Sequence, residues 1–249
     1  MKTIFKKSDQ WRVVSDQQDS APDHHSFAFT LIELLVVIAI MGVIAGFTIP
    51  VLKSVKAAQQ KKVARAELEH LQTALENYKA KYGAYPPSNQ KAAGVYTPPI
   101  YGSMLSQLYY ELAGTTISSG NFVTLDGSAS IPVASVNTAY GVGGFVNCTK
   151  GSGEDGAIAK NFLPSLSSKQ IGAVSNNSVA NTALLATSIG GPDVAYQPLG
   201  ISGLNPFRYV YPGVNNPGGY DLWVQLVISG QTNLICNWSR QVQINSPLP

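Results

Sequence analysis

The sequence predicts an α+β fold in which one long N-terminal helix packs on a small C-terminal antiparallel sheet. Two patterns predict it: a helical pattern from about residue 30 to residue 82, and a strand–turn–strand pattern within residues 205–249. The helical pattern changes character halfway, because an uncharged apolar run comes first and an amphipathic stretch follows. A long helix followed by neighbouring antiparallel strands is typical of the α+β class.

Residues 1–28 precede the apolar run and are interpreted as a leader. A secretory signal has an apolar stretch of about 7–15 residues with a small-residue cleavage site after it. Here the small residue, Ala28, lies before the run, so cleavage between Ala28 and Phe29 would leave the apolar helix on the mature protein. The leader holds four basic and four acidic side chains: Lys2, Lys6, Lys7, Arg12, Asp9, Asp16, Asp19 and Asp23. The basic cluster at its start favours a cytoplasmic leader.

Residues 29–52 are predicted to form the transmembrane half of the long helix. From Leu34 to Leu52 the chain has 19 residues without a charged side chain. Such a helix spans about 28 Å, which is close to the hydrocarbon thickness of a bilayer. A single carboxylate, Glu33, stands at the start of this run and would cost several kcal/mol in lipid unless it is paired. We therefore expect Glu33 to have a function and a partner, such as a freed α-amino group.

Three residues within the apolar run bear on how the helix packs. Gly42 and Gly46 form a small-xxx-small pair, which lets two helices approach closely. Pro50 lacks a backbone N–H and is expected to kink or loosen the helix nearby. An ordinary single-span anchor stays open as the alternative to an assembly helix.

Residues 53–83 are predicted to continue the helix as its amphipathic half. One stripe of larger apolar side chains recurs at three- and four-residue steps: Val63, Leu68, Leu71, Leu75, Tyr78 and Tyr82. The other faces carry charged side chains that we expect to be solvated: Lys61, Lys62, Arg65, Glu67, Glu69, Lys79 and Lys81. Gly83 is the expected stop, and Pro86 and Pro87 prevent the helix from resuming.

The rest of the chain divides into a variable part and a sheet. Residues 84–204 are predicted to be loop-rich, with one helix at Ser103–Leu112 and short elements of uncertain placement. In residues 205–249 we expect strands at Phe207–Tyr211, Leu222–Ser229, Asn233–Trp238 and Gln241–Ile244. The second and third of these strands form a hairpin that turns at Gly230 and Gln231.

Composition favours an exported structural protein over an enzyme. Charged residues make up only 12% of the chain, while it contains 23 glycines and 15 prolines. The formal net charge of +3 is too small to predict nucleic-acid binding. His24 and His25 would leave with the leader, His70 is isolated, and Glu154 and Asp155 lie in a glycine-rich turn. No nucleophile elbow, P-loop or H-E-x-x-H pattern is present, so we predict no catalytic residues.

The chain has two cysteines, Cys148 and Cys236, which lie far apart in the sequence. In an oxidising compartment an even count permits a disulfide. Two isolated buried thiols are the equal alternative, because no metal-ligand spacing surrounds either residue.

The residues around the leader boundary resemble the type IV prepilin signature. A small residue, Ala28, precedes Phe-Thr-Leu-Ile-Glu at 29–33, and an apolar helix follows. The family usually has glycine where this chain has Ala28. The resemblance implies cleavage by a prepilin peptidase between Ala28 and Phe29, and N-methylation of Phe29. It also implies recognition and assembly roles for four residues, of which the glutamate pairs with the N-terminal amine of a neighbouring subunit: Thr30, Leu31, Ile32 and Glu33.

The C-terminal part resembles the major pseudopilins of type II secretion. The segments that carry this resemblance are Asn205–Tyr209, Tyr211–Gly213 and Tyr220–Trp223, together with the helix end at Tyr78–Pro86. Major pseudopilins commonly hold calcium in an acidic loop after the Asp-Leu-Trp strand. Here no carboxylate follows Asp221, whereas calcium takes about six to eight oxygen ligands. We therefore expect no cofactor, with calcium as the alternative.

These resemblances imply a structural subunit of a type II secretion pseudopilus. The expected partners are other copies, other pilin-like subunits, the prepilin peptidase, an inner-membrane assembly platform and membrane lipid, and no nucleic acid. The expected location is the bacterial inner membrane, with a single pass, a periplasmic C-terminal domain, and extraction into a filament. A subunit of a type IV pilus or DNA-uptake filament is the first alternative. A membrane-anchored binding module, whose loops at 84–204 capture a ligand, is the second.

Overall fold

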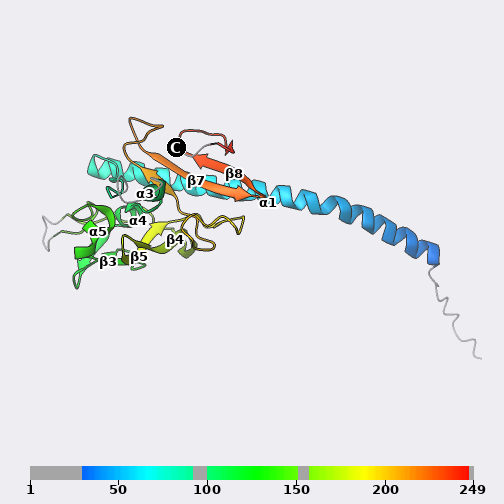
Figure 1. Cartoon of the computed structure of the whole chain (residues 1–249), viewed down its shortest axis with the longest axis horizontal. Coiled ribbons are helices and arrows are strands. Elements are labelled where there is room, and N and C mark those ends of the chain that lie inside the picture. Colours follow the sequence, from blue (N-terminus) through cyan, green and yellow to red (C-terminus); the bar gives the residue numbers. More distant parts are fainter. Residues whose placement is uncertain (1–29, 92–99, 151–156, 247–249) are drawn as a thin grey trace, which may run out of the picture. The chain divides into compact units, whose positions relative to one another are not determined.

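The structure is a computed structural model that describes residues 30–91, 100–150 and 157–246 (Figure 1). The side chains of residues 47–51, 100 and 101 are outside this description. The chain divides into two units, Met1–Pro50 and Val51–Pro249. The second unit contains every strand described below.

The helix α1 runs from Leu31 to Tyr82 over 52 residues (Figure 1). The helix continues through Pro50, and the boundary between the two units falls directly after this residue. The helix ends as predicted at Gly83, which has a φ of +81° and donates its N–H to the Lys79 carbonyl at 2.7 Å. This left-handed conformation suits glycine, because glycine has no Cβ to clash.

Within the described residues, no helix is both long enough and apolar enough to cross a membrane.

The second half of α1 buries one stripe against the rest of its unit. The stripe recurs at steps of four and three residues, with one extra alanine beside it at 74: Ala64, Leu68, Leu71, Ala74, Leu75 and Tyr78. The prediction was wrong at Val63, which is 36% exposed, because the neighbouring Ala64 occupies the inward position.

The C-terminal sheet has four antiparallel strands in the order β6-β7-β8-β9. Their bounds are β6 Arg208–Val210, β7 Asp221–Ile228, β8 Gln231–Cys236 and β9 Gln243–Ile244. The predicted hairpin is confirmed, although β8 begins at Gln231 and not at Asn233. The turn was predicted one residue too late: its two residues are Ser229 and Gly230, and both have positive φ (52° and 76°), as two-residue hairpin turns require. The α+β prediction, with a long helix packed on this sheet, is thereby confirmed.

One face of this sheet shares the main hydrophobic core with α1. Leu222, Val224 and Leu226 alternate along β7, and Ile235 lies opposite Val224 on β8. All four side chains are fully buried. The alternation of period two thus decides which face meets the helix.

The part between α1 and this sheet is more regular than the sequence predicts. It contains two further antiparallel sheets, β1-β2-β3 and β4-β5. Their bounds are β1 Thr115–Ser118, β2 Asn121–Thr124, β3 Ser130–Pro132, β4 Ile171–Asn176 and β5 Val179–Leu185. The sequence predicted short elements here without placing them; strands as short as these, rich in Ala, Ser, Thr and Asn, give a weak sequence pattern.

The single helix predicted at Ser103–Leu112 is two short helices, α3 Ile100–Met104 and α4 Leu108–Ala113. A third, α5, spans Val136–Tyr140, and two 3₁₀ turns span Val133–Ser135 and Ser168–Gln170. The Ala183 amide donates to the Tyr110 hydroxyl at 3.1 Å, which ties β5 to α4. These elements contribute to the same core as α1 and β7.

Candidate functional site

The start of α1 is closed by a reciprocal cap between Thr30 and Glu33. The Thr30 amide and hydroxyl both donate to Glu33 Oε2 at 2.8 Å, and the Glu33 amide donates to Thr30 Oγ1 at 3.3 Å. This is the capping box that T-x-x-E sequences form. The prediction assigned Glu33 an intermolecular partner and missed this partner within the chain, although the spacing of Thr30 and Glu33 signals it.

The large apolar side chains before and after Glu33 face outward on every side of the helix. Each of them is exposed: Leu31, Ile32, Leu34, Leu35, Val36, Val37, Ile38, Ile40, Met41, Val43 and Ile44. Leu31 is the most exposed, at 81%, and Val37 the least, at 40%. A helix that is apolar all round needs an apolar environment that its own chain does not supply.

Four other residues were predicted to act in processing or in helix packing: Ala28, Phe29, Gly42 and Gly46. A Cβ added at Gly42 or Gly46 would meet nothing within 4 Å, so both glycines face open space. Ala28 and Phe29, the predicted cleavage and methylation positions, lie outside the described residues. The packing role of the two glycines stays a prediction.

Two charged residues of α1 each hold a loop of the second unit. Arg65 donates to the carbonyl oxygens of Cys236, Ser239 and Arg240 at 2.7, 3.0 and 3.2 Å. The prediction that Arg65 is solvated was wrong, because these carbonyls follow β8 and approach α1 only in the folded chain.

Glu67 holds the second loop. Its carboxylate accepts from the Thr187 hydroxyl at 2.6 Å, from the Ser188 amide at 3.2 Å, and from the Ser188 hydroxyl. Thr187 follows β5 almost directly. Glu67 was also predicted to be solvated, and its partners lie 120 and 121 residues away in the sequence.

Near its C-terminal end, α1 contacts a buried carboxylate. Glu111 of α4 is fully buried and accepts from Tyr78 Oη at 2.9 Å and from the Val146 and Asn147 amides at 3.0 Å. Burial raises the pKa of Glu111, while its three donors act in the opposite direction. The pKa of Tyr78 is also raised, first by burial and then by the Glu111 charge. The charge of Lys150 also lowers the pKa of Glu111, by less than the hydrogen bonds do.

Asn147 extends this network to the loops beside it. Its side-chain oxygen accepts from Tyr82 Oη at 2.6 Å and from the Lys160 amide at 2.9 Å. Its amide nitrogen donates to the Glu111 and Lys160 carbonyls at 2.6 and 2.7 Å. One buried side chain thus joins α1, α4 and two loops.

Both cysteines are free and buried in the structure. Of the two alternatives left open by the sequence, the pair of buried thiols is the one observed. Burial raises the pKa of Cys236, which disfavours its thiolate.

The carboxylate of Asp221 is occupied by its own loop. Its Oδ2 accepts from the Val214 and Asn215 amides at 2.9 and 2.8 Å, and its Oδ1 accepts from the Asn216 amide at 3.0 Å. In the described part of the chain, no three His, Cys, Asp or Glu side chains converge as a metal site would require. The Asp221 carboxylate thus serves to hold the N–H groups of its own loop.

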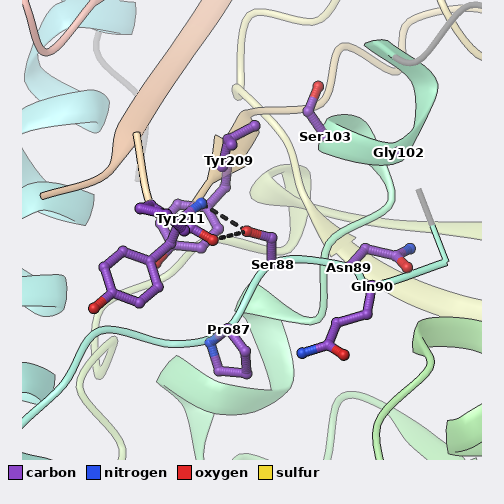
Figure 2. Close-up of a pocket in the computed structure, with 10 residues that line it drawn as sticks. Pro87, Ser88, Asn89, Gln90, Gly102, Ser103, Tyr209 and Tyr211 are labelled. Atoms are coloured by element: carbon purple, nitrogen blue, oxygen red, sulfur yellow. Dashed lines mark hydrogen bonds between the residues drawn. The ribbon is translucent and has the colours of Figure 1, made fainter. Parts of the chain in front are cut away.

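Figure 2 shows a cavity of about 540 Å³ between residues 87–90 and the end of β6. Ser88 Oγ donates to the Tyr211 carbonyl and accepts from the Tyr211 amide, both at 2.6 Å. Asn89 donates to the Leu105 carbonyl at 2.6 Å. These polar groups therefore position the 87–90 segment against β6, and none of the described lining residues is acidic, basic or a thiol.

One family model and several curated proteins are similar to part of this chain. A family model described as the prokaryotic N-terminal methylation motif matches residues 24–49. The type II secretion system core protein G of Vibrio cholerae is 34% identical over 71 residues, which cover 28% of this chain and 49% of that protein. Its Escherichia coli counterpart is 40% identical over 62 residues, 25% of this chain and 43% of that protein.

A type IV major pilin protein, PilE1 of Neisseria gonorrhoeae, is 34% identical over 97 residues, 37% of this chain and 58% of that protein. The chain thus spans about half the length of these curated relatives. No solved structure matches the chain significantly. The motif at 24–49 and these relatives agree: the chain carries a prepilin-type N-terminal methylation motif and is similar over part of its length to type II secretion core protein G and to a type IV major pilin.

Proposed function

We propose that this protein is a filament subunit whose N-terminal helix holds it in the bacterial inner membrane before assembly. The observation that carries the proposal is the exposed apolar surface of residues 31–44, within which Glu33 is the single carboxylate. Lipid covers such a surface in the free subunit, and neighbouring helices cover it in a filament. Prepilin peptidase would cleave between Ala28 and Phe29, and methylation would follow at Phe29.

Within this class, we propose a pseudopilin of a type II secretion system, with its soluble domain in the periplasm. The likeness to core protein G of two organisms supports this assignment, as does the C-terminal segment at 205–223. A type IV pilus or DNA-uptake subunit is the second candidate, because PilE1 matches over a longer stretch. A deletion strain separates the two: loss of exoprotein secretion supports the first, and loss of pili or of DNA uptake supports the second.

The assembly role of Glu33 is tested with two substitutions. Glu33→Ala removes both the cap and the charge, whereas Glu33→Gln keeps an acceptor for Thr30 and removes only the charge. Both variants should be cleaved and should keep a folded soluble domain, yet fail to enter filaments. Normal filament yield from Glu33→Gln would show that charge pairing is not what drives assembly.

Intact-mass analysis of the membrane-extracted protein tests processing itself. Loss of residues 1–28 together with the mass of one methyl group is the expected result. An uncleaved chain in cells that contain the peptidase would contradict the proposal. It would favour the membrane-anchored binding module, for which cross-linking should then find only monomers. The proposed role is mechanical and needs no catalytic residues or cofactor.

A further inference from the structure

One arginine of the second unit is buried without a carboxylate partner. Arg208, the first residue of β6, has no exposed surface. It lies opposite Trp223 of β7 in the sheet. Leu222 and Val224, on either side of Trp223, face the core shared with α1, so Arg208 and Trp223 lie on the other face. A charge buried there is strongly destabilising unless a partner stabilises it.

The hydrogen bonds of Arg208 leave most of its donors unused. Nη2 donates to Tyr196 Oη at 2.6 Å, and the Tyr196 hydroxyl donates onward to Gln225 Oε1 at 3.2 Å. The other two nitrogens, Nε and Nη1, are buried and have no acceptor among the described residues. A neutral phenol accepts a hydrogen bond but supplies no negative charge. Tyr196 therefore does not compensate the positive charge of Arg208.

The carboxylates nearest in the sequence are engaged elsewhere. Residues 157–246 contain two, Asp193 and Asp221. Asp193 Oδ1 accepts from the Ala195 amide at 3.1 Å, and Asp221 holds its own loop. Burial lowers the pKa of Arg208, and among the described residues only Tyr196 opposes this effect. No described carboxylate therefore compensates the charge.

Two acidic side chains of the second unit, Glu154 and Asp155, lie outside the described residues. The described chain that follows them is tied to α1, because Lys81 Nζ donates to the Ile158 carbonyl at 2.7 Å. Arg208 lies on the face of the sheet that points away from α1. Residues 92–99, which are also outside the description, contain no acid. The counter-charge is therefore expected from outside the chain.

Trp223 adds a third donor nitrogen without an acceptor. Its Nε1 is buried and has no hydrogen-bond partner in the described part of the chain. Directly opposite residues of an antiparallel pair have Cβ atoms about 4.5–5.5 Å apart, so these two side chains are close neighbours where they leave the sheet. Buried donors are nearly always paired. A water molecule supplies an acceptor but no charge, whereas an anion supplies both.

We propose that Arg208 and Trp223 form a closed site for a small monovalent anion of the halide class. One positive charge selects one negative charge. Trp223 is 2% exposed and Arg208 is fully buried, so a large anion does not fit. The guanidinium is weakly hydrated, which lowers the cost of removing water from it. Tyr196 is partly exposed, and its loop has to move for the ion to enter or leave. The proposal goes beyond the filament role and concerns the second unit alone.

The test compares anions at equal ionic strength on the processed full-length protein in detergent. Thermal unfolding is followed by circular dichroism in sodium chloride, sodium bromide and sodium gluconate. Chloride and bromide should raise the Tm by about 2–6 °C relative to gluconate, which is too large for a closed site. The NMR line of the chloride ion should also broaden when the protein is added, and excess bromide should reverse this broadening.

Arg208→Met removes the charge and keeps an unbranched side chain. The variant should fold, because an apolar side chain is better tolerated at a buried position than an unpaired charge. Its Tm should no longer differ between chloride and gluconate, and it should not broaden the chloride line. Arg240→Met is the matched control, because Arg240 is exposed. That variant should respond to chloride as the unmodified protein does.

Trp223→Phe tests the other side chain of the site. It keeps a buried aromatic ring and removes the Nε1 donor. The chloride concentration that gives half of the Tm shift should rise about two- to tenfold. This variant and the chloride line decide the question if Arg208→Met does not fold.

Four outcomes would overturn the proposal: equal Tm values of the unmodified protein in chloride and gluconate, a chloride effect that Arg208→Met retains, an equal loss of that effect in Arg240→Met, or a half-effect concentration that Trp223→Phe does not change. The first would show that water alone completes these hydrogen bonds. None of these results bears on Glu33 or on processing. Failure here is therefore distinguishable from failure of the proposed filament role.

Discussion

The two halves of α1 belong to one helix but differ in the exposure of their apolar side chains. Between Leu31 and Ile44, the large apolar side chains are exposed all around the helix. Between Ala64 and Tyr78, the apolar side chains occupy one stripe that is fully buried, and polar side chains occupy the rest. The first half therefore depends on its surroundings for an apolar contact, whereas the second half obtains that contact from its own chain.

The largest expected effect tests the buried half. Leu75→Ala removes a side chain with no exposed surface and leaves a cavity in the core shared by α1 and β7. It should cost about 2–5 kcal/mol of unfolding free energy, measured by denaturant titration. The matched change in the first half, Leu34→Ala, removes a side chain that is 59% exposed, and should cost less than about 0.5 kcal/mol. Equal costs would show that the two halves do not differ as described.

A smaller effect is expected where charged residues hold loops to the buried half. Glu67→Ala leaves the Ser188 amide and the Thr187 and Ser188 hydroxyls without their acceptor, at a cost of about 1–3 kcal/mol. Hydrogen exchange should also quicken at residues 187–188. Glu69→Ala is the control, because Glu69 is exposed on the same helix. If both variants are equally stable, the contact with Glu67 does not hold the loop.

The pH dependence of stability tests the buried network of Tyr78 and Glu111. Burial raises the pKa of Glu111, so the folded chain retains a proton that the unfolded chain loses near pH 4.5. This stabilising contribution is present at low pH and is lost as the pH rises from about 4.5 through the raised pKa. Glu111→Gln should flatten that part of the pH profile in thermal unfolding, while Glu69→Gln should leave it unchanged. A profile that keeps its slope in Glu111→Gln would assign the effect to another group.

The smallest effect is expected at the exposed start of the helix. Thr30→Ala removes the hydroxyl that donates to Glu33 and accepts from its amide. Hydrogen exchange should quicken at the amides of residues 31–34, with no change in the unfolding of the soluble part. Thr30→Ser keeps the hydroxyl and should behave as the unmodified chain. Faster exchange in Thr30→Ser as well would mean that the cap does not protect this turn.

Local patterns predicted the parts of the fold that local interactions determine. The end of α1 at Gly83 and the hairpin of β7 and β8 both follow from residues within a few positions of each other. The stripe on α1 was predicted in register, except that the small side chain of Ala64 replaces Val63 as the buried one. The same kind of pattern, T-x-x-E, also encodes the cap at Glu33.

Distant contacts are what the sequence could not predict. Arg65 reaches a carbonyl 171 residues away, and helical periodicity cannot tell such a side chain from a solvated one. Asn147 lies in a glycine-rich stretch without periodicity, yet it joins α1 to α4 and to the loop at Lys160. Strands β4 and β5 were not placed for a related reason, because their small polar residues gain their burial only from the elements that cover them.

In the cap at the start of α1, the two oxygens of the Glu33 carboxylate differ in their hydrogen bonds. Both donors of Thr30 bind Oε2, and no donor among the described residues binds Oε1. A carboxylate has acceptor sites on each oxygen. One oxygen can therefore keep the first turn wound while the other receives an ammonium group from an adjoining molecule. Docking a subunit would then add a bond without breaking one, so the helix start need not unravel at each addition.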